Sequence, residues 1–139
     1  MIKVATPGAA GVWVVKVIYV YAMESENYDE TMPHLNMDKY HMMVRSEIMR
    51  GRFRNSFEKP EPFTPNQKTE VAIKLQDINH TFKKGHKLQI QVQSTWFPLI
   101  DLNPQTFVPN IFEASEEDFK TQTHTVYGDS KIKFTEIKN

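Results

Sequence analysis

An alternating pattern in the centre of the chain limits the possible folds more than any other feature. Leu88, Ile90 and Val92 alternate with lysine and glutamine, so an extended backbone would place the apolar side chains on one face and the polar side chains on the other. Gly85 precedes the pattern, where a positive φ costs little, and Pro98 follows it, where a residue without an N–H ends a ladder. The pattern predicts a β-strand with one buried face.

Other segments also have the composition of strands. The run from Val12 to Tyr21 is dense in β-branched and aromatic residues and predicts a central strand. A polar segment from Glu24 to Asp38 predicts a loop, and the chain resumes as a strand from His41 to Ile48. A second alternating segment, from Glu70 to Leu75, predicts a strand next to the Leu88–Val92 strand and antiparallel to it.

The second half of the chain holds another long predicted loop. Ile100 to Asn110 contains two prolines and two asparagines, and we expect an ordered loop anchored by Phe107 and Val108. The acidic segment from Glu113 to Phe119 predicts a helical turn. Strands are expected over Thr121 to Tyr127 and Lys131 to Ile137, joined by a turn at Gly128–Asp129, and an extended surface connection is expected at Pro60, Pro62 and Pro65.

Composition excludes several classes of protein. A chain of 139 residues predicts a single domain, residues 1–139, with one core. Lys plus Arg and Asp plus Glu are equal at 17 each, so no net field favours nucleic acid. The longest apolar run is too short to span a membrane, and the N-terminus lacks the apolar stretch of a signal peptide. Absence of cysteine leaves the compartment open, whether periplasmic, secreted or cytoplasmic.

No set of residues predicts catalysis. Ser56, His80 and Asp77 could be combined on paper as nucleophile, base and orienting group, but no serine lies in a G-x-S-x-G elbow. We therefore predict no catalytic residue in this chain.

The sequence also predicts no cofactor or metal. The five histidines lack the spacing of a helical zinc site, and we expect His80 and His86 to fix their loops through hydrogen bonds to backbone. Asp101 and Asn103 offer oxygen ligands for calcium, but too few carboxylates lie near them.

Two groups of residues are candidates for a contact surface. Arg50, Arg52 and Arg54 alternate and would share one face of a strand, where Glu58, Glu61 or backbone carbonyls could receive them. That face is either solvated and salt-bridged or in contact with another domain. Trp96, Phe97 and Phe107 fall in loops, where they either form a contact surface or close the end of a sandwich. As a contact surface beside Gln89, Gln91 and Gln93, they would suit carbohydrate.

Four motifs resemble one known family. These are RGRFRNSFEKP at Arg50–Pro60, FKKGHKL at Phe82–Leu88, STWFP at Ser94–Pro98 and DLNPQ at Asp101–Gln105. Together they resemble the C-terminal domain of the cocaine esterase and X-Pro dipeptidyl-peptidase hydrolases, and the branch that looks nearest is the α-amino-acid ester hydrolases, often labelled glutaryl-7-aminocephalosporanic acid acylases. The resemblance runs from about Trp13 to about Tyr127.

The resemblance implies an all-β, jelly-roll β-sandwich, similar to galactose-binding domains, that packs on an α/β-hydrolase domain of the same polypeptide. The parent would be a serine hydrolase acting on esters or amides of α-amino acids or on β-lactam acyl groups, and the chain alone should be inactive because the triad lies elsewhere. The candidate contact residues are Arg50, Arg52, Arg54, Trp96, Phe97, Asp101, Asn103 and Phe107. A free-standing carbohydrate-binding module and a purely structural packing domain are the alternatives.

The chain departs from the family at three positions. Val12, Tyr19 and Leu102 occupy positions that are usually charged in the family, which puts in doubt any polar contact made there. The family's domain also has sequence upstream of Trp13 that supplies strands, so we expect this domain to be truncated at its N-terminus. A missing strand would leave an open sheet edge, from which we expect homo-oligomers at high protein concentration.

Overall fold

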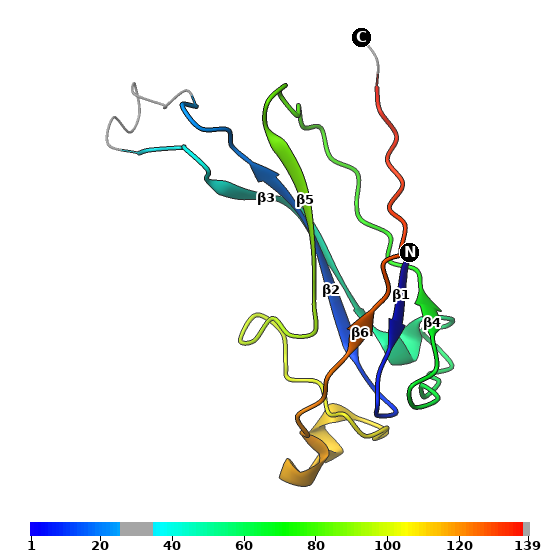
Figure 1. The fold of residues 1–139 in the computed structure, drawn as a ribbon. Helices are drawn as coiled ribbons and strands as arrows, with labels where there is room; N and C mark the ends of the chain where they lie inside the picture. The colour runs from blue at the N-terminus through cyan, green and yellow to red at the C-terminus, as the bar shows by residue number, and fades with distance from the viewer. Residues whose placement is uncertain (26–34, 138–139) are drawn as a thin grey trace. The chain divides into compact units, whose positions relative to one another are not determined.

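The computed structural model describes residues 1–25 and 35–137 and has an all-β fold (Figure 1). Its strands form two three-stranded sheets, with the orders β4-β1-β6 and β3-β2-β5. Among the described residues, no helix is long and apolar enough to span a membrane. The elements are β1 (Ile2–Ala5), β2 (Val12–Val20), β3 (His41–Arg50), β4 (Thr69–Val71), β5 (Lys87–Gln93) and β6 (Thr125–Val126), with short 3-10 helices η1 (Gly51–Phe53), η2 (Ile111–Glu113) and η3 (Glu116–Asp118).

The chain divides into two compact units, which we describe separately. Unit 1 comprises residues 1–13, 48–74 and 93–139, and unit 2 comprises residues 14–47 and 75–92. The sheet β4-β1-β6 lies within unit 1. Most of β2, β3 and β5 belongs to unit 2.

Strand β1 is the centre of the first sheet. It pairs antiparallel with β4, with Ile2 opposite Val71, and antiparallel with β6, with Val4 opposite Val126. Val4 and Val71 have no exposed surface. The sequence patterns had predicted no strand before Val12, because a strand of four residues is too short to show a clear period.

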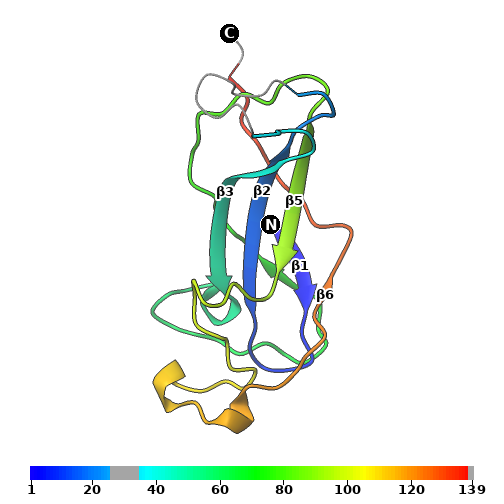
Figure 2. The same ribbon diagram turned by 90° about the vertical axis from the view of Figure 1, so that its left-hand side faces the viewer.

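Strand β2 confirms the predicted central strand. All of its residues except Lys16 are buried, and it lies between β3 and β5 (Figure 2). Strands buried on both faces have continuous apolar sequences, which explains why this segment shows no alternation. The predicted strand from His41 is also confirmed, as β3. Of the loop predicted over Glu24–Asp38, residues 26–34 lie outside the described residues.

The predicted pairing of the two alternating segments is wrong. Strand β4 stops at Val71 and pairs with β1, whereas β5 pairs with β2, so the segments belong to different sheets. The error follows from the omission of β1, which takes the place next to β4. The face of β5 that was predicted to be buried is also wrong. Leu88 and Ile90 are 46% and 36% exposed, while Gln89 and Gln91 on the other face are partly buried.

The predicted C-terminal hairpin is also wrong, although its turn at Gly128–Asp129 is present. Apart from the turn itself, where the Ser130 N–H donates to the Tyr127 carbonyl at 3.1 Å, residues on both sides bond to the N-terminal segment. The Tyr127 N–H donates to the Lys3 carbonyl at 2.9 Å, and the Lys131 N–H donates to the Met1 carbonyl at 2.9 Å. Strand β1 has a free edge of backbone donors and acceptors that would stay unpaired if the two C-terminal segments bonded only to each other.

Gly51 is buried in unit 1, where the backbone and the Phe63 ring approach it closely. The Gly51 N–H donates to the Gly11 carbonyl at 2.8 Å, and the Phe63 N–H donates to the Ala9 carbonyl at 2.8 Å. Phe63 is 3% exposed, and its ring lies where a β-carbon on residue 51 would be, at 2.3 Å. The predicted surface connection is confirmed, since the three prolines around Phe63 are exposed.

In unit 2, aromatic and imidazole rings surround Tyr19. The ring of His86 stacks on Tyr19 with centroids 4.8 Å apart, and His80 and Phe82 contact it edge-on at 5.0 and 5.6 Å. His80 Nε2 and His86 Nδ1 are buried and have no hydrogen-bond partner among the described residues. These two nitrogen atoms therefore do not make the predicted hydrogen bonds to backbone, and the ring contacts with Tyr19 hold both histidines in place.

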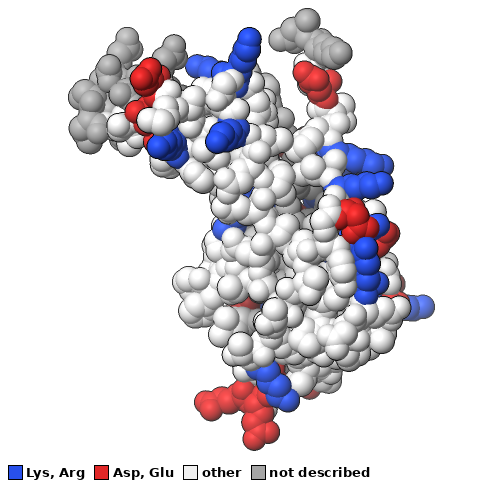
Figure 3. Space-filling view, viewed as in Figure 1, with Lys and Arg blue, Asp and Glu red and all other residues white. Residues whose placement is uncertain are grey.

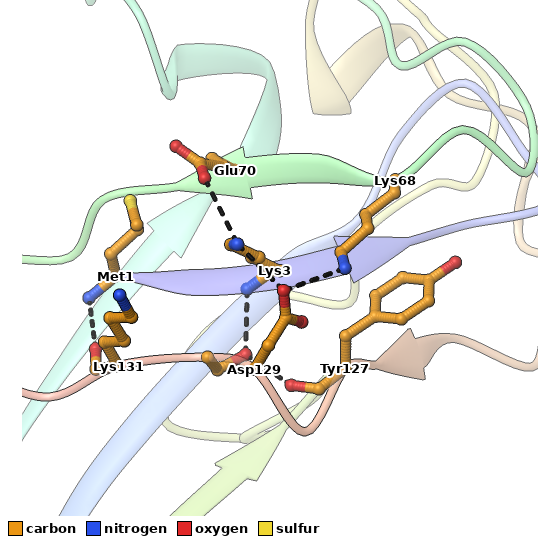
Figure 4. Close-up of polar contacts among 8 residues, drawn as sticks. Met1, Lys3, Lys68, Glu70, Tyr127, Asp129 and Lys131 are labelled. Carbon is orange, nitrogen blue, oxygen red and sulfur yellow. Dashed lines mark hydrogen bonds and ion pairs between the residues drawn. The ribbon is translucent and has the colours of Figure 1, made fainter.

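A charged cluster ties the C-terminal segment to β1 and β4 (Figure 4). The Asp129 carboxylate accepts hydrogen bonds from Lys3 Nζ at 2.8 Å and Lys68 Nζ at 2.9 Å, and Glu70 lies 3.7 Å from the same Lys3 nitrogen. The Ser130 hydroxyl accepts from the Lys3 N–H at 2.9 Å. Acidic and basic side chains accordingly lie side by side along this edge in Figure 3.

We expect the Asp129 cluster to make stability depend on pH. Hydrogen bonds from Lys3 and then Lys68 lower the pKa of Asp129 to about 2. A carboxyl group whose pKa is lower in the folded state stabilises the fold above its unfolded pKa, about 3.9, and this contribution is lost as the pH falls through about 2. Asp129→Asn should lower the melting temperature at pH 7 by more than it does at pH 2.5, as measured by circular dichroism. Glu70→Gln, which removes a longer ion pair, is the control, and an Asp129→Asn effect that is equal at both pH values would contradict this account.

We expect Gly51→Ala to destabilise the chain because its new β-carbon would overlap the buried Phe63 ring. Overpacking of this kind costs about 1–3 kcal/mol. Gly128→Ala is the matched control, since nothing lies within 4 Å of its added β-carbon. Urea unfolding should show a lower midpoint for Gly51→Ala alone, and equal midpoints for the two variants would show that the Phe63 ring can move aside.

Candidate functional site

The eight predicted contact residues all lie in unit 1, on two segments. The arginines belong to residues 50–54, which form the end of β3 and continue through η1. The other five residues belong to residues 96–107, which follow β5. The three arginines do not share one face of a strand, because only Arg50 is in β3 and the chain turns into η1 at Gly51. Each arginine consequently has different partners.

Arg54 has a structural role. Its guanidinium donates to the carbonyls of Gly51, Glu61 and Pro62 at 2.9–3.0 Å, and Nη2 lies 3.6 Å from the Glu61 carboxylate. The same group lies 4.5 Å from the centre of the Phe63 ring. Because its side chain is only 10% exposed, Arg54 is part of the folded core more than of an open contact surface.

Arg52 is fixed in place but not neutralised. Its Nη1 donates to the Val108 carbonyl at 2.6 Å, and its guanidinium carbon lies 4.4 Å from the centre of the Phe107 ring. None of the ion pairs among the described residues includes Arg52. Phe107 and Val108 thus anchor the long loop, as predicted, and do so through Arg52.

Arg50 has weaker partners. Its Nη1 lies 3.4 Å from Asn103 Oδ1, and its Nη2 lies 3.5 Å from Asp101 Oδ2, which are long distances for hydrogen bonds. The Asp101 side chain is 68% exposed, so this ion pair is largely open to solvent. Since both oxygens face a guanidinium, Asp101 and Asn103 already have a cation of the protein beside them, which disfavours the calcium site considered from the sequence.

Arg50 and Arg52 line a pocket of about 410 Å³, which we call the arginine pocket. Among the described residues that line it, the charged ones are Arg50, Arg52 and Asp101. Thr106, on the wall, donates to Asp118, and this hydrogen bond is the main cause of a lowered pKa for the Asp118 carboxyl. The full lining consists of Ala10, Gly11, Arg50, Arg52, Phe53, Asp101, Asn103, Pro104, Thr106, Pro109, Asn110 and Ile111.

An apolar groove of about 270 Å³ adjoins the arginine pocket, and the two share Asp101 and Ile111. The groove is lined by Phe97, Asp101, Leu102, Ile111, Phe112 and Phe119. Phe97 is 64% exposed and Phe112 is 91% exposed. Exposed phenylalanines at adjacent positions form a surface that would gain free energy by burial.

Sequence patterns identified part of this surface and missed the rest. Phe97 was predicted, whereas Phe112 and Phe119 were not, because the acidic residues between them indicated only a solvated helical turn. Phe112 lies in η2, and Phe119 directly follows η3. Figure 3 shows acidic side chains gathered over these two short helices. Two phenylalanines flanking a short acidic segment are the signal that could have revealed the groove. Trp96 differs from Phe97 in being partly buried.

The other candidate chemistry is not assembled by the described residues. Ser56 belongs to unit 1, and its hydroxyl accepts from the N–H groups of Glu58 and Lys59 at 3.2 Å, as in a turn. Asp77 and His80 belong to unit 2. In the described part of the chain, no three His, Cys, Asp or Glu side chains are grouped so that they could hold a metal ion, and His34 lies outside that part.

Comparisons with known proteins relate the chain to one family and to solved structures of larger enzymes. The family described as "X-Pro dipeptidyl-peptidase C-terminal non-catalytic domain" matches residues 2–133. A solved structure of an alpha-amino acid ester hydrolase is 42% identical, with a TM-score of 0.82 over 91% of this chain and 20% of that one. An aminopeptidase from the marine sediment archaeon Thaumarchaeota archaeon is 39% identical, with a TM-score of 0.81 over 90% of this chain and 20% of that one. No curated protein gives a significant match. The chain thus spans about a fifth of the length of these two solved proteins.

We expect Arg54 and Arg50 to respond differently to substitution. Arg54→Gln should lower the free energy of unfolding by about 2 kcal/mol, because it removes charge-assisted bonds from three carbonyls at a nearly buried site. Arg50→Gln should change it by less than about 0.5 kcal/mol, because its bonds are long and its partner is exposed. Urea unfolding of both variants measures the difference. A larger loss for Arg50→Gln would show that the long bonds matter for folding.

Proposed function

This chain belongs to the family of X-Pro dipeptidyl-peptidase C-terminal non-catalytic domains, and from that membership we propose that it packs on the catalytic domain of a larger serine hydrolase. The partner is an α/β-hydrolase domain of the same polypeptide, which carries the catalytic triad. Two solved relatives are about five times as long as the aligned region, which supports a parent protein with further domains. The proposed role is to stabilise that domain and to shape the entrance of its active site.

The observation that carries this proposal is the exposed apolar surface of unit 1. Phe97, Leu99 and Leu102 are 64%, 67% and 48% exposed within a single short loop, residues 96–103, which we call the docking loop. The docking loop follows β5 and is closed by a hydrogen bond from the Ile100 N–H to the Trp96 carbonyl at 3.2 Å. A surface of this kind, beside the apolar groove, is suited to burial against another domain.

The eight candidate contact residues divide into two groups under this proposal. Phe97, Asp101, Asn103 and the two outer arginines, Arg50 and Arg52, belong to the contact surface. The other three residues stabilise that surface without forming it. Trp96 and Arg54 are partly buried, and Phe107 packs on Arg52.

The proposed substrates of the parent are esters or amides of α-amino acids. The names of the two relatives support this class, since one is an alpha-amino acid ester hydrolase and the other is an aminopeptidase. Action on β-lactam acyl groups belongs to the same proposal and rests on sequence resemblance alone. The finer fold assignment, a single jelly-roll β-sandwich similar to galactose-binding domains, is also proposed, and the two antiparallel pairings of β1 are consistent with it.

A carbohydrate-binding role has less support. It would require an open face of amides, but Gln89 and Gln91 are partly buried, and the Gln93 side chain donates to the Thr95 carbonyl at 2.5 Å. Amides that are covered or already bonded are poor receptors for sugar hydroxyls.

We expect the double substitution Phe97→Ser and Leu102→Ser to loosen the domain contact in the intact hydrolase polypeptide. Each apolar anchor lost from a well-packed interface costs about 2 kcal/mol, so the two domains should unfold in separate transitions by scanning calorimetry. The same double substitution should leave the 139-residue chain folded, because both side chains are exposed.

Phe134→Ser is the control for that experiment, since Phe134 is 56% exposed but lies outside the docking loop and the groove. The domains should stay coupled in this variant. If the double variant also unfolds as the parent does, with an unchanged KM, the docking loop is not the contact surface.

A further inference from the structure

We propose that the arginine pocket is a carboxylate-binding site, filled by an acidic side chain of the catalytic domain. This inference rests on the proposed function and adds the chemistry of the partner group. It follows from the charge of the pocket, the free donors of its arginines, their rigid support and the position of the apolar groove.

The charge of the pocket favours a single negative group. Arg50 and Arg52 contribute two positive charges, and Asp101 contributes one negative charge, which leaves a net charge of one positive. The chain as a whole has a formal net charge of zero, so this excess is local. A carboxylate would neutralise it, whereas a phosphate dianion would leave a negative excess beside Asp101.

The arginines also have donors to offer. Arg52 uses Nη1 for the Val108 carbonyl, and its Nε is buried with no hydrogen-bond partner among the described residues. The contacts from Arg50 to Asn103 and Asp101 are at 3.4 and 3.5 Å, beyond the usual range of a strong bond. An incoming carboxylate could therefore form shorter bonds to Arg50 while Asp101, which is 68% exposed, turns to solvent at little cost.

The pocket is rigid enough to bind without large rearrangement. Phe107 and the Val108 carbonyl hold the Arg52 guanidinium. Two other lining residues are also held in place, since the Asn103 amide donates to the Pro104 carbonyl at 2.7 Å and Asn110 Oδ1 accepts from the Phe112 N–H at 3.0 Å. Donors that are already positioned lose little conformational entropy on binding, so a weak carboxylate ligand can still be recognised.

The adjoining groove indicates that the carboxylate comes from a protein and not from a free small molecule. Asp101 and Ile111 line both cavities, so a ligand in the pocket lies next to the apolar side chains of Phe97 and Phe112. A segment of the catalytic domain that carries Asp or Glu beside an apolar residue would fill both sites together. A charged anchor with an apolar neighbour is a common arrangement at the centre of protein interfaces.

Acetate is the probe for the pocket in the 139-residue chain. Sodium acetate titrated at constant ionic strength should give saturable NMR shifts at the amides of residues 101–106 and at the Arg50 side chain. Arg50→Gln should weaken acetate binding by about tenfold or more. Arg45→Gln, which removes a guanidinium that donates to the Asp77 carbonyl in unit 2, should have no effect. Absence of saturation, or tighter binding of phosphate than of acetate, would overturn the carboxylate assignment.

Hydrogen exchange in the intact hydrolase polypeptide tests the source of the carboxylate. Residues 101–111 should exchange more slowly there than in the 139-residue chain, and Arg50→Gln should restore fast exchange at these residues while Arg45→Gln does not. Slow exchange that is insensitive to Arg50→Gln would overturn this inference and leave the proposed docking intact. Equal exchange in the two proteins would instead count against the docking itself.

Discussion

The double pairing of β1 holds unit 1 together. Met1 to Ala5 hydrogen-bonds on one edge to β4 and on the other edge to β6 and the segment after it, so three distant parts of the chain meet on one short strand. The Asp129 cluster adds charge at the same place, because Lys3 and Lys68 both reach one carboxylate. Strand β1 thus has backbone partners on both edges, and a third strand adds stability because an isolated pair of short strands is at best marginally stable.

The arginines between Arg50 and Arg54 show how similar residues acquire different roles from a change in backbone direction. Had the strand continued, all three would have shared one face and repelled one another. At Gly51 the chain turns, and the Phe63 ring lies so close that a β-carbon on this residue would overlap it. After the turn, Arg54 points into the core, whereas Arg50 and Arg52 line a pocket. The turn at Gly51 thus separates the role of Arg54 from that of Arg50 and Arg52.

Sequence patterns predicted the elements whose signal is long and local. The apolar run of β2, the strand β3 and the turn at Gly128–Asp129 were all recognisable from residues close together in the chain. The pairing of strands was not, because β1 is too short to show a period and alternation identifies two faces without telling which is covered. Leu88 and Ile90 illustrate this, since their alternation predicted a strand correctly but the wrong buried face.

The candidate site was predictable to a similar degree. Phe97 and the arginines were identified by residue type and motif, and the family resemblance drawn from them agrees with the family match over residues 2–133. The arginine pocket and the groove were not foreseen, because both are lined by residues that are distant in the sequence. The pocket brings residues 50–53 next to residues 101–111, and the groove brings Phe97 next to Phe112 and Phe119, which no local pattern can reveal.

The proposed docking is tested most directly by the solvent accessibility of Phe97, which is 64% exposed in the chain alone. Hydroxyl-radical footprinting with mass spectrometry can compare the oxidation of this side chain in the 139-residue chain and in the intact hydrolase polypeptide at equal radical dose. The account predicts that Phe97 is strongly protected in the intact polypeptide. Equal oxidation of Phe97 in the two proteins would contradict it.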